Sequence, residues 1–133
     1  MSNGFKLEIV NPEKSFLSKN DVSEVVVPAF EGDMGILKDH ISIISFLKPG
    51  LVRVFESVAN EETYYVEDGI IEFKNNCLSI LTSNIFDIKT IDKNVVRDAL
   101  TKAEKETQNK DISDQKKYLL DQKIDVLKSL TLN

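Results

Sequence analysis

The sequence predicts an α+β protein in which an N-terminal antiparallel β-sandwich, over residues 1–88, precedes a C-terminal antiparallel two-helix hairpin, over residues 89–133. Apolar and polar residues alternate with a period of two as far as about Ile88, which is the pattern of strands with one buried face. Turn-forming residues recur about every eight to twelve positions in this part, as in a sandwich or barrel. From Asp92 onward there is no glycine or proline, and helix-forming residues dominate.

Short alternating runs define the expected strands. The first covers residues 5–9, where apolar and charged side chains alternate. The second covers residues 24–27 and stops at Pro28, which is tolerated at the end of a strand. Further strands are expected at residues 41–47, 51–55, 63–66, 70–73 and 77–81.

Glycine and asparagine mark the turns between these strands. Gly32 and Gly35, three residues apart and flanked by apolar runs, predict a sharp turn with positive φ. Gly69 closes a second turn, and Asn75 with Asn76 suits a two-residue hairpin. None of these turns carries an obvious reactive group, so they predict architecture rather than catalysis.

Two amphipathic helices account for the remaining residues. Their apolar faces consist of Val95, Val96, Ala99, Leu100 and Ala103 in the first helix and Leu119, Leu120, Ile124, Leu127 and Leu130 in the second. Thr90 or Asp92 can cap the first helix. Asp111 or Ser113 can cap the second, after a polar link. Because helices of this length are marginal in isolation, their apolar faces must pack on each other, on the sandwich or on another chain.

Composition and charge exclude several classes of function. The chain is 41% apolar with a formal net charge of −5, and its acidic excess lies in the first two thirds, whereas the helical tail is slightly basic. No clustered basic face is expected for binding nucleic acid or an anionic membrane surface. The N-terminus lacks the pattern of a signal peptide, and residues 41–47 are too short to cross a bilayer. We therefore expect a soluble cytoplasmic chain without direct membrane insertion.

The sequence contains no recognisable catalytic, metal or phosphate-binding motif. His40 is the only histidine and has no nucleophile motif nearby, so a packing or hydrogen-bonding role is expected. Cys77 is the only cysteine and fits a small strand residue. Glu31, Asp33 and Asp39 are interpreted as solvated turn carboxylates. Since G-x-G-x-x-G and G-K-[ST] are both absent, the sequence favours a binding protein over an enzyme.

Residues 25–54, VVVPAFEGDMGILKDHISIISFLKPGLVRV, resemble the N-terminal domain of the epsilon subunit of bacterial F-type ATP synthases. In that family E-G-[DE]-[LM]-G-I, a histidine four residues on and a later P-G recur in this order. Residues 64–81, YYVEDGIIEFKNNCLSIL, are similar to the family's succession of an aromatic strand, a glycine turn, an apolar strand and a short hairpin. The resemblance runs from about Leu7 through the second helix and implies a flattened β-sandwich.

The resemblance implies two docking surfaces on the sandwich. In the family, one part of this domain binds the γ subunit, and its lower end rests on the polar loops of the c-ring. Carried over position by position, the γ-facing residues are His40, Ser42 and Ser45. The residues near the c-ring are Asn11, Glu31, Gly32 and Asp33.

The resemblance also implies that the hairpin is regulatory. It would switch between a folded-down and an extended state. In the extended state Lys116, Lys117 and Lys123 would contact an acidic segment of the catalytic β subunit and oppose rotation in the hydrolysis direction.

Two positions depart from the family's pattern. Lys38 and Asp39 stand where members often have proline or glycine before the histidine. Some members bind ATP through I/L-D-x-x-R-A at the start of the first helix, but here Val95 replaces the arginine and Arg97 lies on a different side of the helix. We therefore expect neither ATP binding nor any other cofactor.

The predicted function is that of a non-catalytic central-stalk subunit of F-type ATP synthase. It would couple γ to the c-ring during proton-driven, or alternatively sodium-driven, ATP synthesis, and inhibit ATP hydrolysis through its C-terminal helices. It would be peripheral, on the cytoplasmic side of the bacterial plasma (inner) membrane. The alternative is a stand-alone protein-binding adaptor, and an enzyme is a distant third interpretation.

Overall fold

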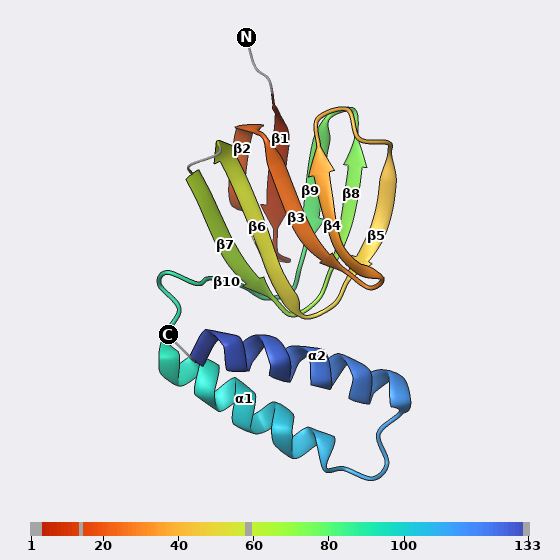
Figure 1. The fold of residues 1–133 in the computed structure, drawn as a ribbon, viewed down its shortest axis with the longest axis vertical. Helices are drawn as coiled ribbons and strands as arrows, with labels where there is room; N and C mark the ends of the chain where they lie inside the picture. Colours follow the sequence, from red (N-terminus) through yellow and green to blue (C-terminus); the bar gives the residue numbers. More distant parts are fainter. Residues whose placement is uncertain (1–3, 14, 58–59, 132–133) are drawn as a thin grey trace.

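The structure is a computed structural model that describes residues 4–13, 15–57 and 60–131. Its described residues form ten strands followed by two helices. The strands curl into a β-sandwich, and the helices lie side by side beneath one end of it (Figure 1). The predicted α+β fold is therefore confirmed. The strands are β1 Phe5–Val10, β2 Ser15–Val22, β3 Glu24–Ala29, β4 Gly32–Leu37, β5 Ile43–Leu47, β6 Gly50–Ser57, β7 Asn60–Val66, β8 Gly69–Lys74, β9 Cys77–Leu81 and β10 Ile85–Asp87.

The strands follow the order β10-β7-β6-β3-β5-β8-β9-β1-β2, and β4 pairs with β3 outside this path. All pairs are antiparallel except β1 with β9, which run parallel with Lys6 opposite Cys77. A fully antiparallel sandwich was expected, and the long connection between these two strands in the chain permits the parallel pair. Strands β2, β4 and β10 were not expected, because β2 is mostly exposed, β10 is only three residues long and β4 contains both glycines of the predicted turn.

The core lies between the two layers of the sandwich and is built from alternate residues of each strand. Phe5 meets Phe73 edge to face, with ring centroids 5.5 Å apart, a favourable aromatic geometry. An ion pair joins β2 to β6, with Lys19 Nζ 2.5 Å from Glu56 Oε1. The core residues are Phe5, Leu7, Ile9, Val22, Val25, Val27, Ile36, Leu47, Val52, Val54, Tyr64, Val66, Ile71, Phe73, Leu78, Ile80 and Ile85.

The turns confirm one prediction and correct another. Asn75 and Asn76 both have positive φ, 52° and 55°, as a two-residue hairpin turn between β8 and β9 requires. Gly32 has φ 136° at the β3–β4 turn. The positive φ predicted for Gly35 is wrong, because Gly35 lies inside β4 opposite Val26. The two residues between the strands complete the turn, so a second glycine is not needed there.

Gly50 allows β6 to start against β3. A Cβ atom at this position would lie 2.5 Å from Cβ and 2.9 Å from Cγ of Pro28, whose ring is buried. A backbone hydrogen bond joins the same two chain segments, because Lys48 N donates to the carbonyl of Pro28 at 3.0 Å. The P-G pair of the sequence therefore marks a close approach of two chain segments.

The helices form an antiparallel pair, α1 Lys93–Thr107 and α2 Asp114–Thr131, capped as the sequence predicts. Asp92 Oδ1 accepts a hydrogen bond from Asn94 N at 2.8 Å, and Ser113 Oγ accepts one from Lys116 N at 3.1 Å. The predicted apolar face is correct except at Val95, which is 46% exposed. Neither helix has both the length and the apolar character needed to cross a membrane, and the described residues contain no other helix.

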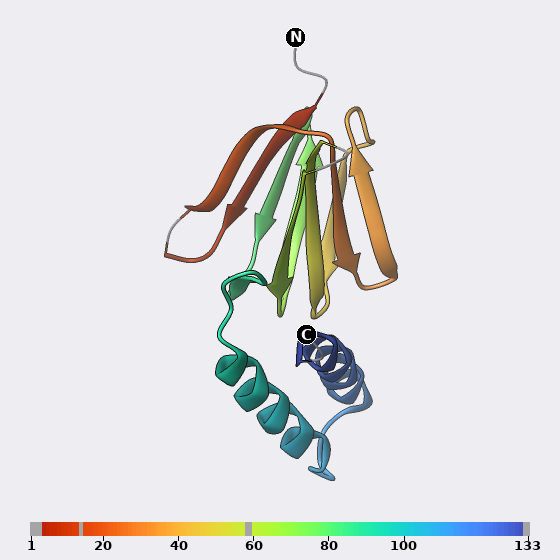
Figure 2. The same ribbon diagram turned by 60° about the vertical axis from the view of Figure 1, so that its left-hand side comes forward.

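The helices lie below the lower end of the sandwich (Figure 2). A second apolar cluster joins them to β6, β7 and β10. It is separate from the sandwich core, so each part has an apolar centre of its own. The helices pack more closely on each other than on the strands. Its buried members are Tyr65, Val96 and Leu127, and Leu51, Phe86, Ile88, Ile91, Ala99, Leu100, Val126 and Leu130 pack against them.

We predict that Gly50→Ala destabilises the chain by about 1–3 kcal/mol, because the added methyl group overlaps the buried ring of Pro28 and the strands must move apart. The measurement is the free energy of unfolding from urea titration. Gly35→Ala is the matched control, since its Cβ would approach only the flexible end of Glu24, at 3.0 Å. Equal unfolding midpoints for the two variants would contradict the prediction.

Candidate docking surfaces

The predicted γ-facing residues lie partly at the end of the sandwich away from the helices. His40 follows β4, and its ring meets Phe73 edge to face at 5.9 Å between centroids. Its Nδ1 donates to the carbonyl of Ile41 at 2.8 Å. Asp39 has φ 65°, so it adopts the left-handed conformation. Asn76 holds it there, accepting from Asp39 N at 2.7 Å and donating to Asp39 Oδ1 at 2.9 Å.

The other two predicted γ-facing residues lie just before and within β5. Ser42 precedes β5 and is exposed, whereas Ser45 lies within β5 and is half-buried. Because side chains alternate along a strand, Ser45 shares a face with buried Leu47, while Ile44 and Phe46 point outward. The outward residues are 67% and 60% exposed. The outward face of β5 therefore consists of the apolar side chains Ile44 and Phe46, whereas the sequence predicted a contact made by serine hydroxyls.

An outer apolar patch extends from these residues across β8 and β9. We define it as Phe30, Ile44, Phe46, Ile70 and Leu81, each of which is at least 40% exposed. Phe46 lies opposite Ile70, which lies opposite Leu81, so the three cross the sheet in one row. Contiguous exposed apolar patches on soluble chains mark interaction sites. Sequence reasoning missed the patch, although the adjacent apolar pairs Ile43-Ile44 and Phe46-Leu47 carried the signal of a strand with apolar side chains on both faces.

A pocket of about 620 Å³ adjoins the outer apolar patch at the end of the sandwich near the helices. Four patch residues line it together with Pro12, Pro49 and Leu119 of α2. The pocket thus continues the apolar surface from the sheet towards the hairpin.

The predicted c-ring residues belong to two turns at the same end of the sandwich. Asn11 lies in the β1–β2 turn, and Glu31, Gly32 and Asp33 lie at the β3–β4 turn (Figure 1). The structure brings the two turns to one pocket, which Pro12 and Phe30 both line. Glu31 and Asp33 are exposed, and Asn11 is half-buried.

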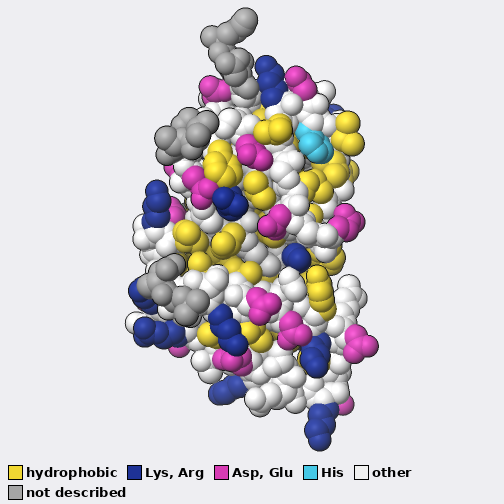
Figure 3. All heavy atoms as spheres, in the orientation of Figure 1, with side chains coloured by type: hydrophobic (Ala, Val, Ile, Leu, Met, Phe, Trp, Pro, Cys, Tyr) yellow, Lys and Arg dark blue, Asp and Glu magenta, His cyan; other side chains and the backbone are white. Residues whose placement is uncertain are grey.

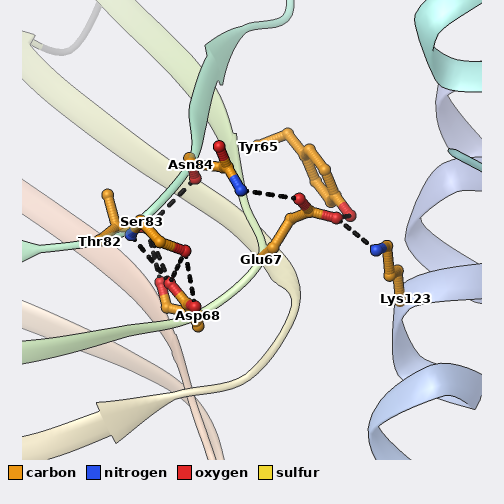
Figure 4. A network of polar contacts seen from close by, with 7 residues as sticks. All are labelled: Tyr65, Glu67, Asp68, Thr82, Ser83, Asn84 and Lys123. Carbon is orange, nitrogen blue, oxygen red and sulfur yellow. Dashed lines mark hydrogen bonds and ion pairs between the residues drawn. The ribbon is translucent and has the colours of Figure 1, made fainter. Parts of the chain in front are cut away.

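The β7–β8 turn at this end is held by a polar network, shown in Figure 4. Asp68 accepts from Ser83 N at 3.0 Å and from Ser83 Oγ at 2.8 Å, and Thr82 Oγ1 donates to the Asp68 carbonyl at 2.7 Å. Burial opposes ionisation of Asp68, but the hydrogen bonds from Ser83 and Thr82 outweigh it and hold the pKa of Asp68 below its usual value. The network fixes the turn to the connection between β9 and β10.

The three lysines predicted to contact the β subunit are in different environments. Lys123 Nζ lies 2.5 Å from Glu67 Oε2, across the boundary between α2 and the sandwich (Figure 4). Lys116 Nζ is 4.0 Å from Glu106 Oε2 of α1, and its side chain is exposed. Lys117 is also exposed. In the observed arrangement Lys116 and Lys117 are therefore accessible, whereas Lys123 is engaged within the chain.

The described residues offer little for metal or nucleotide chemistry. They contain no group of three or more His, Cys, Asp or Glu side chains arranged to hold a metal ion. Val95 lines a small pocket with Asp87 and Asp92, whose carboxylates would repel phosphate groups. On the face in Figure 3, acidic and basic side chains are interspersed and hydrophobic ones reach the surface between them. This surface suits protein docking better than binding of an extended polyanion.

Comparisons with known proteins agree with this description. The family described as "ATP synthase, Delta/Epsilon chain, beta-sandwich domain" matches residues 4–88. The ATP synthase epsilon chain of Pelagibacter ubique is 71% identical over 130 residues, which cover 98% of this chain and 99% of that protein. The epsilon chain of Dichelobacter nodosus is 37% identical over 105 residues, 79% of this chain and 73% of that protein.

Similar folds occur in solved ATP synthase structures. A chain in the Euglena gracilis mitochondrial ATP synthase structure, described as OSCP/F1/c-ring, has a TM-score of 0.76 at 18% identity. The match covers 99% of this chain and 82% of that one. A chain in the central stalk and c-ring structure from Tetrahymena thermophila has a TM-score of 0.65 at 15% identity, covering 98% of both chains. At these identities the likeness establishes the fold.

We predict that Asp68→Asn lowers the free energy of unfolding by about 0.5–1 kcal/mol at neutral pH, a modest value because the site is partly exposed. The folded-state pKa of Asp68 is lowered, so its contribution is present above the unfolded value, about 4, and is lost as pH falls through the folded pKa. Unfolding measured from pH 7 to pH 2 should show the parent and variant converging in acid. Asp33→Asn, at an exposed position in β4, is the control. A constant difference at all pH values would contradict the prediction.

Proposed function

The chain belongs to the ATP synthase delta/epsilon family, as an epsilon chain without catalytic activity of its own, and from this premise we propose that it joins the γ subunit to the c-ring in the rotor of a bacterial F-type enzyme. The sandwich would act as a rigid coupling through which torque passes between the membrane rotor and the catalytic head. The enzyme would be proton-driven, and the chain peripheral on the cytoplasmic side of the plasma (inner) membrane. Family membership favours this role over a stand-alone adaptor.

The outer apolar patch is the observation that carries the proposed contact with γ. Phe30 and Phe46 stand 6.5 Å apart between ring centroids and are exposed, although burial of aromatic rings is strongly favourable. Aromatic side chains of this kind supply much of the affinity at protein interfaces. His40 and Ser42 lie beyond Ile44, towards the far end of the sandwich, where polar groups would form the rim of the contact. Ser45 faces the same side of β5 as buried Leu47, opposite to Ile44 and Phe46, so it would not take part in a contact made by the patch.

The two turns that contain Asn11, Glu31, Gly32 and Asp33 are the proposed contact with the c-ring. The named residues are polar, and Phe30 of the same β3–β4 turn belongs to the outer apolar patch and lines one pocket with Pro12. The proposed c-ring contact therefore adjoins the proposed γ contact at this edge of the sandwich. This geometry supports simultaneous contact with γ and with the polar loops of the c-ring.

The hairpin is the proposed regulatory element. The observed arrangement is folded against the sandwich. In an extended arrangement, Lys116, Lys117 and Lys123 would contact an acidic segment of the catalytic β subunit and resist rotation in the hydrolysis direction. The helices pack less extensively on the strands than on each other, which supports a movement of the hairpin as a unit, because elements with fewer buried contacts open at lower free-energy cost.

The proposal includes no nucleotide or other cofactor on this chain. Val95 occupies the position where ATP-binding members have arginine, and the neighbouring carboxylates of Asp87 and Asp92 oppose phosphate binding.

We predict that Ile44→Asp and Phe46→Asp each weaken binding to isolated γ at least about tenfold, because a carboxylate would have to be desolvated in an apolar contact. Titration calorimetry measures the affinity, and circular dichroism checks the fold. Val95→Asp, at an exposed apolar position on α1 outside the patch, should bind like the parent chain. Parent-like affinity of both patch variants, or an equal loss in Val95→Asp, would sink the proposal that the patch binds γ.

We predict that the double variant Lys116→Gln, Lys117→Gln raises the ATP hydrolysis rate of the assembled catalytic head about two- to fivefold, since it removes exposed charge pairs with the β subunit. Added salt should have the same effect on the parent complex by screening. Lys105→Gln, an exposed lysine near the end of α1, is the control. An unchanged rate would reduce the hairpin to a structural role in this protein.

A further inference from the structure

The boundary between hairpin and sandwich contains a polar contact as well as the apolar cluster. Lys123 of α2 and Glu67 of the β7–β8 turn form an ion pair with an Nζ to Oε2 distance of 2.5 Å. Their side chains are only 25% and 22% exposed. The pair is thus shielded more than an ordinary surface salt bridge, for which the net contribution is small.

Glu67 is held in position by the sandwich itself. The Tyr65 hydroxyl donates to Oε2 at 3.3 Å, and Asn84 Nδ2 donates to Oε1 at 3.4 Å (Figure 4). Burial, with the nearby Glu67 charge, raises the pKa of Tyr65, so its hydroxyl stays protonated and remains a donor. The carboxylate is therefore oriented towards α2 before the lysine binds, which reduces the entropy cost of forming the pair.

The turn that carries Glu67 is also fixed. The adjacent residue, Asp68, is bonded to Ser83 on the β9–β10 connection. The ring of Tyr65 packs in the apolar cluster under the helices, and its hydroxyl contacts Glu67. Tyr65 therefore contacts both the apolar cluster under the hairpin and the carboxylate of the ion pair.

Release of the hairpin would not leave a stranded charge. Glu67 would keep its hydrogen bonds from Tyr65 and Asn84, and the ammonium of Lys123 would enter water. A pair of buried groups without such substitutes would be far more costly to separate. The contact therefore has the energetics of a reversible closure.

We propose that Lys123 and Glu67 form a latch that holds the helical hairpin against the sandwich and sets how often it opens. The latch is a property of the isolated chain and goes beyond the proposed rotor function. Only its consequence for ATP hydrolysis rests on that function. Lys123, which the family resemblance assigns to the extended state, stabilises the folded-down state instead.

Hydrogen exchange of the full-length isolated chain tests the latch. Lys123→Gln and Glu67→Gln should each increase exchange of α2 amides about two- to tenfold, while amides of β3 and β8 exchange as in the parent chain. Lys117→Gln is the matched control, because it removes an exposed lysine from the same helix. The double variant Lys123→Gln, Glu67→Gln should open no more than either single variant, since each already breaks the same pair.

Two results would overturn the latch: exchange in Lys123→Gln equal to that in Lys117→Gln, or additive effects in the double variant. In the assembled enzyme, Glu67→Gln, which releases the hairpin without removing a lysine from the proposed contact with the β subunit, should strengthen inhibition of hydrolysis, opposite to the effect of removing Lys116 and Lys117. A loosened hairpin with unchanged hydrolysis would count against the proposed regulation and leave the latch intact. The two proposals can therefore fail separately.

Discussion

The register of β5, β8 and β9 determines which side chains this chain buries and which it offers to other molecules. Successive residues of a strand point to opposite faces, so a slip of one position would exchange the two sets. The Asn75-Asn76 turn fixes β8 against β9, and parallel pairing with β1 constrains β9 from its other side. In this register Phe73 packs in the core, and Ile70 and Phe46 face outward as neighbours. The outer apolar patch is thus a direct product of the strand pairing that builds the core.

The sandwich and the hairpin differ in how many apolar side chains they bury. The sandwich buries a continuous core, and such packed interiors resist deformation, as a coupling element requires. The hairpin has a smaller apolar cluster, centred on Tyr65, and a partly exposed ion pair. Its attachment is consequently weaker than the internal cohesion of the sandwich, so the boundary between them is where the proposed movement would occur.

Features that depend on local chemistry could be predicted from the sequence, and those that depend on distant contacts could not. The hairpin turn at Asn75 and the cap at Asp92 follow from residues adjacent in the chain. Positive φ was wrongly predicted for Gly35, because the local sequence does not reveal that the turn needs only Gly32 in this conformation. Val95 was wrongly placed on the buried face, because the face of a helix that is buried depends on where the sandwich lies. The parallel pair β1–β9 and the contact of Lys123 with the β7–β8 turn join segments far apart in the sequence, so no spacing rule indicates them.

The lysines of α2 illustrate how one helix can serve two arrangements. An extended hairpin gains contacts for Lys116 and Lys117 but loses the pair between Lys123 and Glu67. A partner can shift the hairpin only by the difference between its affinities for the two arrangements, so a strong latch would require an equally strong partner. A latch made of one partly exposed pair, with Glu67 satisfied by its own neighbours after release, keeps that difference small. Contacts of a few exposed lysines with a partner would then be sufficient to shift the equilibrium from the folded to the extended hairpin. The strength of the pair between Lys123 and Glu67 would determine how much binding free energy the partner must supply.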